Sequence, residues 1–168
     1  MAQERQKQSS DRKISKILVA IDGSEHSMKA ADLALEMADK GQVNKTKEGG
    51  IELIALTVLD ISKPRSFLSS FIAAPTYGLK ELEQERNAAK QWIETVREKA
   101  EAKNVPFSSE MIEGLVSAEA TIVDYAESHK MDLIVVGTRG RTGFSKVLLG
   151  SVASKIVEYA PCSVVVVK

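Results

Sequence analysis

Apolar runs that do not alternate with polar residues are the feature that most limits how this chain can fold. Residues 17–21 read ILVAI and residues 133–136 read LIVV without a break, and residues 51–59 read IELIALTVL, in which only Glu52 and Thr57 are polar. A strand whose consecutive side chains are all apolar must be covered on both faces, which is typical of a parallel sheet lying between helices. The three runs therefore predict strands inside a two-sided sheet.

Segments with helical periodicity separate these runs, and Gly41 is expected to end the first of them. Two shorter strand candidates, 106–113 and 164–167, complete the series. Regular alternation of strands and helices predicts right-handed crossovers, and hence an open five-stranded parallel sheet with helices on both faces. The predicted helices are 25–40, 79–103, 117–128 and 152–160.

The first 13 residues offer almost nothing to bury, so we expect a flexible tail over 1–13 and a single domain over 14–168. Lys plus Arg number 23 and Asp plus Glu number 23, which argues against a broad nucleic-acid surface. The one cysteine, Cys162, favours a reducing setting and is expected to pack as a small apolar residue. With neither a long apolar span nor a signal-like start, the sequence predicts a cytoplasmic protein without membrane partners.

A glycine-rich basic segment, 137–151, follows the strand at 133–136. Its glycines allow close approach of the backbone to a ligand, and Gly150-Ser151 opens a helix, where free N–H groups favour an anion. The segment holds Arg139, Arg141 and Lys146 but no acidic residue. Together these features predict a phosphate site, although neither G-x-x-x-x-G-K-[ST] nor G-x-G-x-x-G is present.

The spacing that is present is G-x2-G-x9-G-[ST], made by Gly137, Gly140, Gly150 and Ser151. It resembles the ATP-binding signature of the universal stress protein family. The segments KILVAIDGSEHS, LTVLD, DLIVVGTRGRTG, LLGSVASKIV and PCSVVVVK extend the resemblance over nearly all of 14–168. The resemblance implies a Rossmann-like sheet of the adenine nucleotide alpha hydrolase type, with strand order 3-2-1-4-5.

The resemblance also implies a role for residues at the strand exits. Ala20 and Val58 would frame the adenine, and Asp22 would lie by the ribose or adenine. Val136 and Gly137 would contact the ribose and the first phosphates. Read from its position alone, Asp22 could equally be a helix-capping residue in the turn before Ser24. Ser24 itself is expected to be the N-cap of the helix that follows.

The remaining implied contacts belong to the phosphate end. Gly140 would lie against the first phosphates, while Gly150, Ser151 and Val152 would hold phosphates through backbone N–H groups and the Ser151 hydroxyl. A divalent ion, Mg²⁺ or Mn²⁺, would be held mainly by the phosphates. Arg139 is the basic residue best placed to reach a phosphate, the alternative being a solvated loop charge.

Two further segments bear on partners. The family pairs its closing strand, here 163–167, across a two-fold axis, which implies a homodimer and agrees with the bare backbone of an edge strand. The segment 60–78 carries Phe67, Leu68, Phe71, Ile72 and Tyr77, which need burial. It either folds back on its own domain, covers the ligand as a lid, or contacts a partner.

The sequence therefore predicts an ATP-binding protein that acts as a nucleotide-responsive stress or regulatory homodimer. Three alternatives stay open: a slow ATP-hydrolysing enzyme, a module whose ligand is AMP or ADP, and an interaction protein without nucleotide. No nucleophile–base pair or paired carboxylates accompany the glycine segment, so no catalytic residue is predicted.

Overall fold

The computed structural model describes residues 14–43, 50–61, 79–140 and 149–168. Five strands form one open sheet in the order β3-β2-β1-β4-β5, and every pairing is parallel, as predicted. The apolar runs form its three inner strands, β1, β2 and β4. The strand bounds are β1 (Lys16–Ala20), β2 (Glu52–Asp60), β3 (Phe107–Gly114), β4 (Leu133–Gly137) and β5 (Ser163–Val167).

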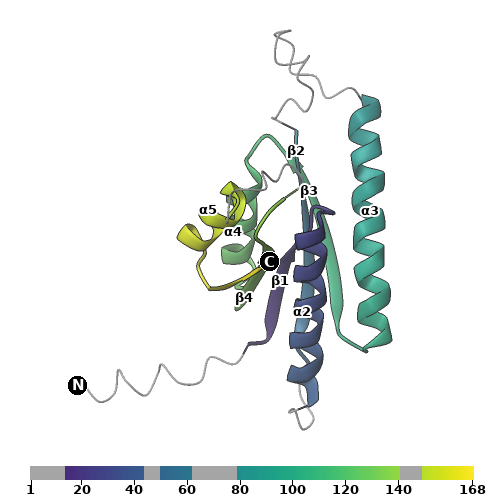
Figure 1. Cartoon of the computed structure of the whole chain (residues 1–168), viewed down its shortest axis with the longest axis vertical. Helices are drawn as coiled ribbons and strands as arrows, with labels where there is room; N and C mark the ends of the chain where they lie inside the picture. The colour runs from purple at the N-terminus through teal and green to yellow at the C-terminus, as the bar shows by residue number, and fades with distance from the viewer. Residues whose placement is uncertain (1–13, 44–49, 62–78, 141–148) are drawn as a thin grey trace, which may run out of the picture.

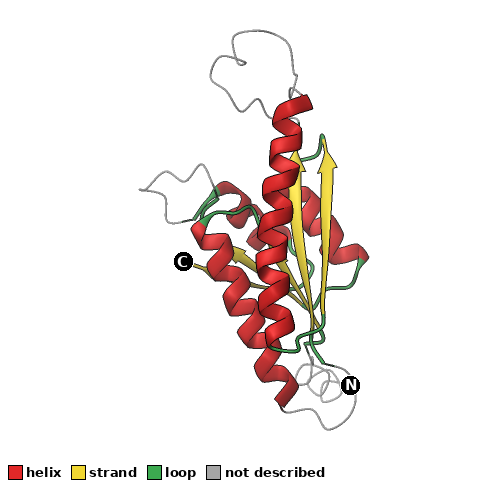
Figure 2. Cartoon of the chain, turned by 90° about the vertical axis from the view of Figure 1, so that its right-hand side faces the viewer, coloured by secondary structure: helices red, strands yellow, loops and turns green. Residues whose placement is uncertain are grey.

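Helices cover both faces of this sheet (Figure 1). One pair of helices, α2 and α3, packs on one face, and Figure 2 views the molecule from that side. The other pair, α4 and α5, packs on the opposite face. The helix bounds are α2 (Glu25–Val43), α3 (Leu79–Ala102), α4 (Ala118–Ser128) and α5 (Ser151–Tyr159).

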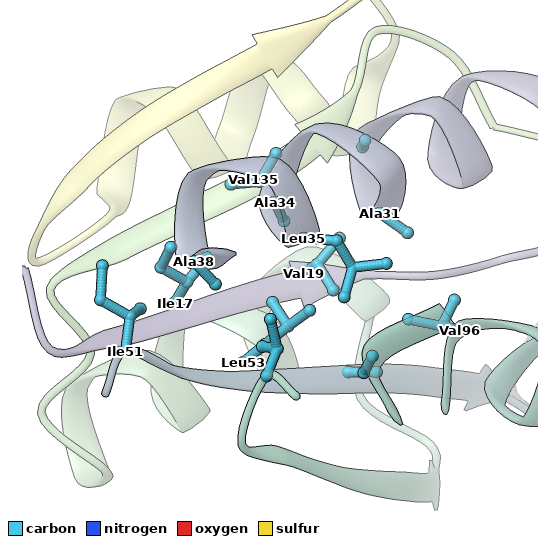
Figure 3. Packing of buried hydrophobic residues seen from close by; sticks show 14 of the residues in the cluster. Ile17, Val19, Ala31, Ala34, Leu35, Ala38, Ile51, Leu53, Val96 and Val135 are labelled. Carbon is cyan, nitrogen blue, oxygen red and sulfur yellow. The ribbon is translucent and has the colours of Figure 1, made fainter. Parts of the chain in front are cut away.

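The face under α2 and α3 carries the larger apolar cluster (Figure 3). Ile17 and Val19 of β1 and Leu53 of β2 point toward Leu35 of α2 and Val96 of α3, and all five are buried. Alternate residues of the same strands face the other way, so continuous apolar runs serve both layers. Truncating a side chain such as Leu35 to alanine would cost about 2–5 kcal/mol.

The opposite face holds a second cluster, which joins the sheet to α4 and α5. Leu18 and Ile134 from the strands pack with Ile122 of α4 and Ile156 of α5. A salt bridge between Glu119 of α4 and Lys155 of α5, 2.6 Å from Oε1 to Nζ, ties the two helices together. Burial alone would raise the pKa of Glu119, but its bond with Lys155 brings the pKa below its usual value overall. The same bond raises the pKa of Lys155.

The prediction that Gly41 ends the first helix is wrong, because α2 continues to Val43. A Cβ atom at position 41 would lie 2.1 Å from Cδ1 of Ile51, the residue just before β2. The glycine therefore gives room for close packing of Ile51 against α2 and does not mark a turn at the helix end. Periodicity within the helix could not reveal a neighbour ten positions away in sequence.

Several predictions concern residues outside the described part of the chain: the tail 1–13, residues 62–78 of the long segment, and Arg141 and Lys146 of the basic segment. The predicted edge position of the closing strand is confirmed, because β5 ends the sheet beside β4. Within the described residues, no helix is long and apolar enough to cross a membrane.

Candidate functional site

The sheet reverses its winding between β1 and β4, and this reversal places a crevice at their carboxyl ends. From β1 the chain first builds outward through β2 and β3, then returns to place β4 on the other side of β1. Open α/β sheets bind ligands at such switch points. The β1–β4 pairing extends to Val19 and Val135, and beyond it the two strand exits carry Asp22 and Thr138.

A cavity of about 400 Å³ lies at this switch point, between the strand exits and the helices α4 and α5. All ten residues that the sequence predicts for the site line this one cavity. They are Ala20, Asp22, Val58, Val136, Gly137, Arg139, Gly140, Gly150, Ser151 and Val152. Their contacts with a ligand stay a prediction.

The cavity is apolar along the sheet. Ala20 of β1, Leu56 and Val58 of β2 and Val136 of β4 form its floor, and Ile122 of α4 faces them. A slot lined by small and branched aliphatic side chains suits a flat, largely apolar group. This wall therefore fits a ring system better than it fits a charged group.

The other end of the cavity is built for an anion. The helix α5 begins there, and its first residues, Ser151, Val152 and Ala153, line the cavity. Its N-cap is Gly150, which has no side chain that could bond to the N–H groups of the first turn. Those groups and the helix dipole favour negative charge, and Arg139 adds a cation to the lining.

Two glycines let the backbone close around this end. A Cβ atom on Gly140 would lie 2.7 Å from Oδ2 of Asp22, and one on Gly150 would lie 3.1 Å from the carbonyl oxygen of Thr138. Neither position offers normal room for a side chain. These two glycines of the sequence motif therefore allow close packing around the cavity, in addition to the backbone freedom that glycine provides.

Asp22 lies two residues before the capping position of α2. The capping residue is Ser24, as the sequence predicted: its Oγ accepts a bond from the N–H of Ser27 at 3.2 Å. Asp22 instead accepts two bonds at Oδ1, from the N–H of Ser24 at 3.0 Å and from its hydroxyl at 2.6 Å. The carboxylate is thereby held at the cavity wall.

Thr138, which the sequence reasoning missed, joins the cavity to two other elements. Its N–H donates to the carbonyl of Val167 in β5, and its own carbonyl accepts from the N–H of Gly150, both at 2.7 Å. The residue is 8 % exposed and lines the cavity, and its Oγ1 has no hydrogen-bond partner among the described residues. A buried hydroxyl without a partner is costly, so this edge of the cavity favours a polar occupant.

Other lining residues were also missed: Ser27 of α2 and Ala118, Ile122 and Ala153 of the covering helices. Within the described residues, no group of three or more His, Cys, Asp or Glu side chains could hold a metal ion.

The family is established by comparison with known proteins. A model of the universal stress protein family matches residues 13–168. A universal stress protein of Methanocaldococcus jannaschii is 37% identical over 155 residues, which are 91% of this chain and 81% of that protein. The chain therefore belongs to the universal stress protein family.

Solved structures agree with the fold. The universal stress protein UspA from Lactobacillus plantarum superposes with a TM-score of 0.70 at 26% identity, covering 94% of this chain and 100% of that chain. An Arabidopsis thaliana family protein with AMP bound has a TM-score of 0.62 at 18% identity, covering 92% and 91%. A universal stress protein in complex with cAMP has a TM-score of 0.64 at 21% identity, covering 93% and 98%.

Proposed function

We propose that this protein binds an adenine nucleotide, with ATP as the main ligand, in the cavity at the exits of β1, β2 and β4. The observation that carries the proposal is that one cavity joins an aliphatic slot to the N-terminus of α5. A nucleotide has the same two-part chemistry, a flat ring at one end and an anion at the other. The AMP and cAMP complexes of proteins with this fold support the choice of ligand.

In this proposal the adenine lies between Ala20 and Val58, and the ribose lies beside Asp22. The phosphates meet the N–H groups of Ser151 and Val152. Val136 and Gly137 border the ribose, while Arg139, Gly140 and Gly150 border the phosphates. A divalent ion, Mg²⁺ or Mn²⁺, would reach the site with the phosphates, and water would complete its coordination.

We further propose that the protein acts as a nucleotide-responsive homodimer in the stress response. The dimer would form through β5, whose outer edge is the end of the sheet. Such an edge offers unpaired N–H and C=O groups that a second copy can pair. Thr138 lines the cavity and bonds to β5, so the same residue would contact both the nucleotide site and the strand that pairs in the dimer.

Isothermal titration calorimetry with ATP, ADP and AMP, with and without Mg²⁺, tests the ligand. We expect saturable binding, weakened by Gly140→Ala, which pushes against Asp22, and by Ser151→Ala, which removes the hydroxyl at the start of α5. The matched control is Gly114→Ala at the end of β3, where a Cβ atom meets only the backbone N of Val116, at 3.9 Å.

Two results would contradict the nucleotide proposal: no heat of binding at high micromolar concentration, or equal losses in Gly140→Ala and Gly114→Ala. Release of nucleotide on denaturing protein purified without added ligand supports it independently. Sedimentation of the same samples measures the dimer, and a monomer at all concentrations would remove the homodimer from the proposal. Phosphate release measured alongside detects any hydrolysis of ATP.

A further inference from the structure

We propose that Ser24 is a positioning residue of this cavity. Its hydroxyl joins Asp22, after β1, to Arg139, after β4, and so sets the geometry of both sides of the switch point. The expected effect on ligand binding rests on the proposed function. The coupling between the two strand exits does not, because its contacts are made by the protein's own residues.

The first contact fixes the carboxylate of Asp22. The Ser24 hydroxyl and the Ser24 N–H lie 2.6 Å and 3.0 Å from the same oxygen, Oδ1. Two donors on one oxygen define the rotation of the carboxylate, and hydrogen bonds to a charged acceptor are the stronger kind. The other oxygen, Oδ2, is then turned toward Gly140, where a Cβ atom would lie 2.7 Å from it.

The second contact spans the opening of the sheet. The ladder between β1 and β4 pairs residues as far as Val19 and Val135. Past that point Ser24 Oγ lies 3.2 Å from the carbonyl oxygen of Arg139, a residue 115 positions away. The hydroxyl has one hydrogen, which it shares between this carbonyl oxygen and the closer Oδ1 of Asp22 in a three-centre bond. One hydroxyl therefore contacts both strand exits where they separate to form the cavity.

Capping of α2 does not account for these contacts. A cap requires only an acceptor for the N–H of Ser27, and Asp, Asn, Ser, Thr and Gly all serve at such positions. At position 24 the group must accept from Ser27 and also donate to Asp22. A hydroxyl does both, whereas an ionised carboxylate cannot donate.

Substitutions of Ser24 separate positioning from capping. Ser24→Gly removes the hydroxyl but keeps the backbone N–H and a residue that caps helices nearly as well. Ser24→Thr keeps the hydroxyl. We expect Ser24→Gly to weaken the binding of both ATP and adenosine about tenfold in calorimetry, because one hydrogen bond to a charged group is lost. Ser24→Thr should keep most of the wild-type affinity.

A double-mutant cycle with Asp22→Asn shows whether Ser24 acts through the carboxylate. If it does, adding Ser24→Gly to Asp22→Asn produces little further loss, because the positioned group is already altered. Independent losses that multiply, or wild-type affinity in Ser24→Gly, would overturn the proposal.

A measurement without ligand keeps the coupling separate from the proposed function. In isotope-labelled protein, Ser24→Gly should shift the carbonyl ¹³C signal of Arg139 and the amide signal of Gly140. The control is Ser117→Gly at the N-cap of α4, where no side-chain capping bond is made, and it should leave both signals in place. Unchanged signals in Ser24→Gly would overturn the coupling even if nucleotide binds. Shifted signals would establish it even if nucleotide does not.

Discussion

Gly23 lies between Asp22 and Ser24, and replacing it with alanine should destabilise the whole protein. Its φ of +77° is in the left-handed region, which costs a residue with a Cβ atom roughly 1–2 kcal/mol. The Cβ atom would also lie 2.1 Å from Cε2 of Trp92, a side chain of α3 packed on the larger core cluster. Forcing extra volume into such a site costs about 1–3 kcal/mol.

These two effects together predict that Gly23→Ala lowers the free energy of unfolding by about 2–5 kcal/mol. For a chain of this size, that corresponds to a fall in Tm of roughly 4–20 °C. Trp92 is the only tryptophan, so its fluorescence follows unfolding in urea, and circular dichroism reports the helices in the same samples.

The matched control is Gly114→Ala, because a Cβ atom there meets only the Val116 backbone N, at 3.9 Å, and its φ is not positive. We expect this control to stay within about 1 kcal/mol of the wild type. Equal stabilities for the two variants would refute the packing assigned to Gly23 and Trp92.

Three further predictions concern stability and reactivity. Burial alone would raise the pKa of Asp132, but hydrogen bonds from Ser15 and from the N–H of Lys16 lower that pKa overall. The ionised Asp132 therefore stabilises the fold fully above about pH 4, and this stabilisation is lost as the pH falls further. Asp132→Ala should therefore cost about 1–3 kcal/mol in denaturant unfolding at pH 7, and a cost that persists unchanged at pH 2.5 would contradict this. Burial raises the pKa of Cys162, so a thiol reagent at pH 7.5 should react more slowly with native than with unfolded protein, and equal rates would oppose it. Gly137→Ala would place Cβ 2.7 Å from the His26 carbonyl carbon, and we expect a loss of about 1–3 kcal/mol by circular dichroism, whereas wild-type stability would exclude that contact.

The strands could be predicted because their environment is recorded in consecutive residues. Ile17 and Leu18 are both fully buried, on opposite faces of the sheet, so an uninterrupted apolar run was required. Gly41 shows where such reasoning fails. Its neighbour Ile51 comes from another element, and a packing requirement between elements leaves no periodic signal along the chain.

The site shows the same contrast between features visible within one segment and contacts made between distant segments. The glycine spacing indicated a phosphate site, and the family resemblance implied the binding positions, ten of which line the cavity because topology brings strand exits together. Ala118 and Ile122 were missed because α4 reaches the cavity through the packing of its helix on the sheet. Ser24 was predicted as a helix cap, but its bond to Arg139 depends on how two distant loops meet.

The central claim is that the cavity at the switch point takes an adenine nucleotide with its phosphates at the start of α5. Titration of isotope-labelled protein with ATP, followed by amide NMR, tests it most directly. We predict saturable shifts concentrated on Gly140, Ser151 and Val152, while amides on the far face, such as Leu35, stay in place. The absence of shifts at millimolar ATP, or shifts centred away from this cavity, would contradict the claim.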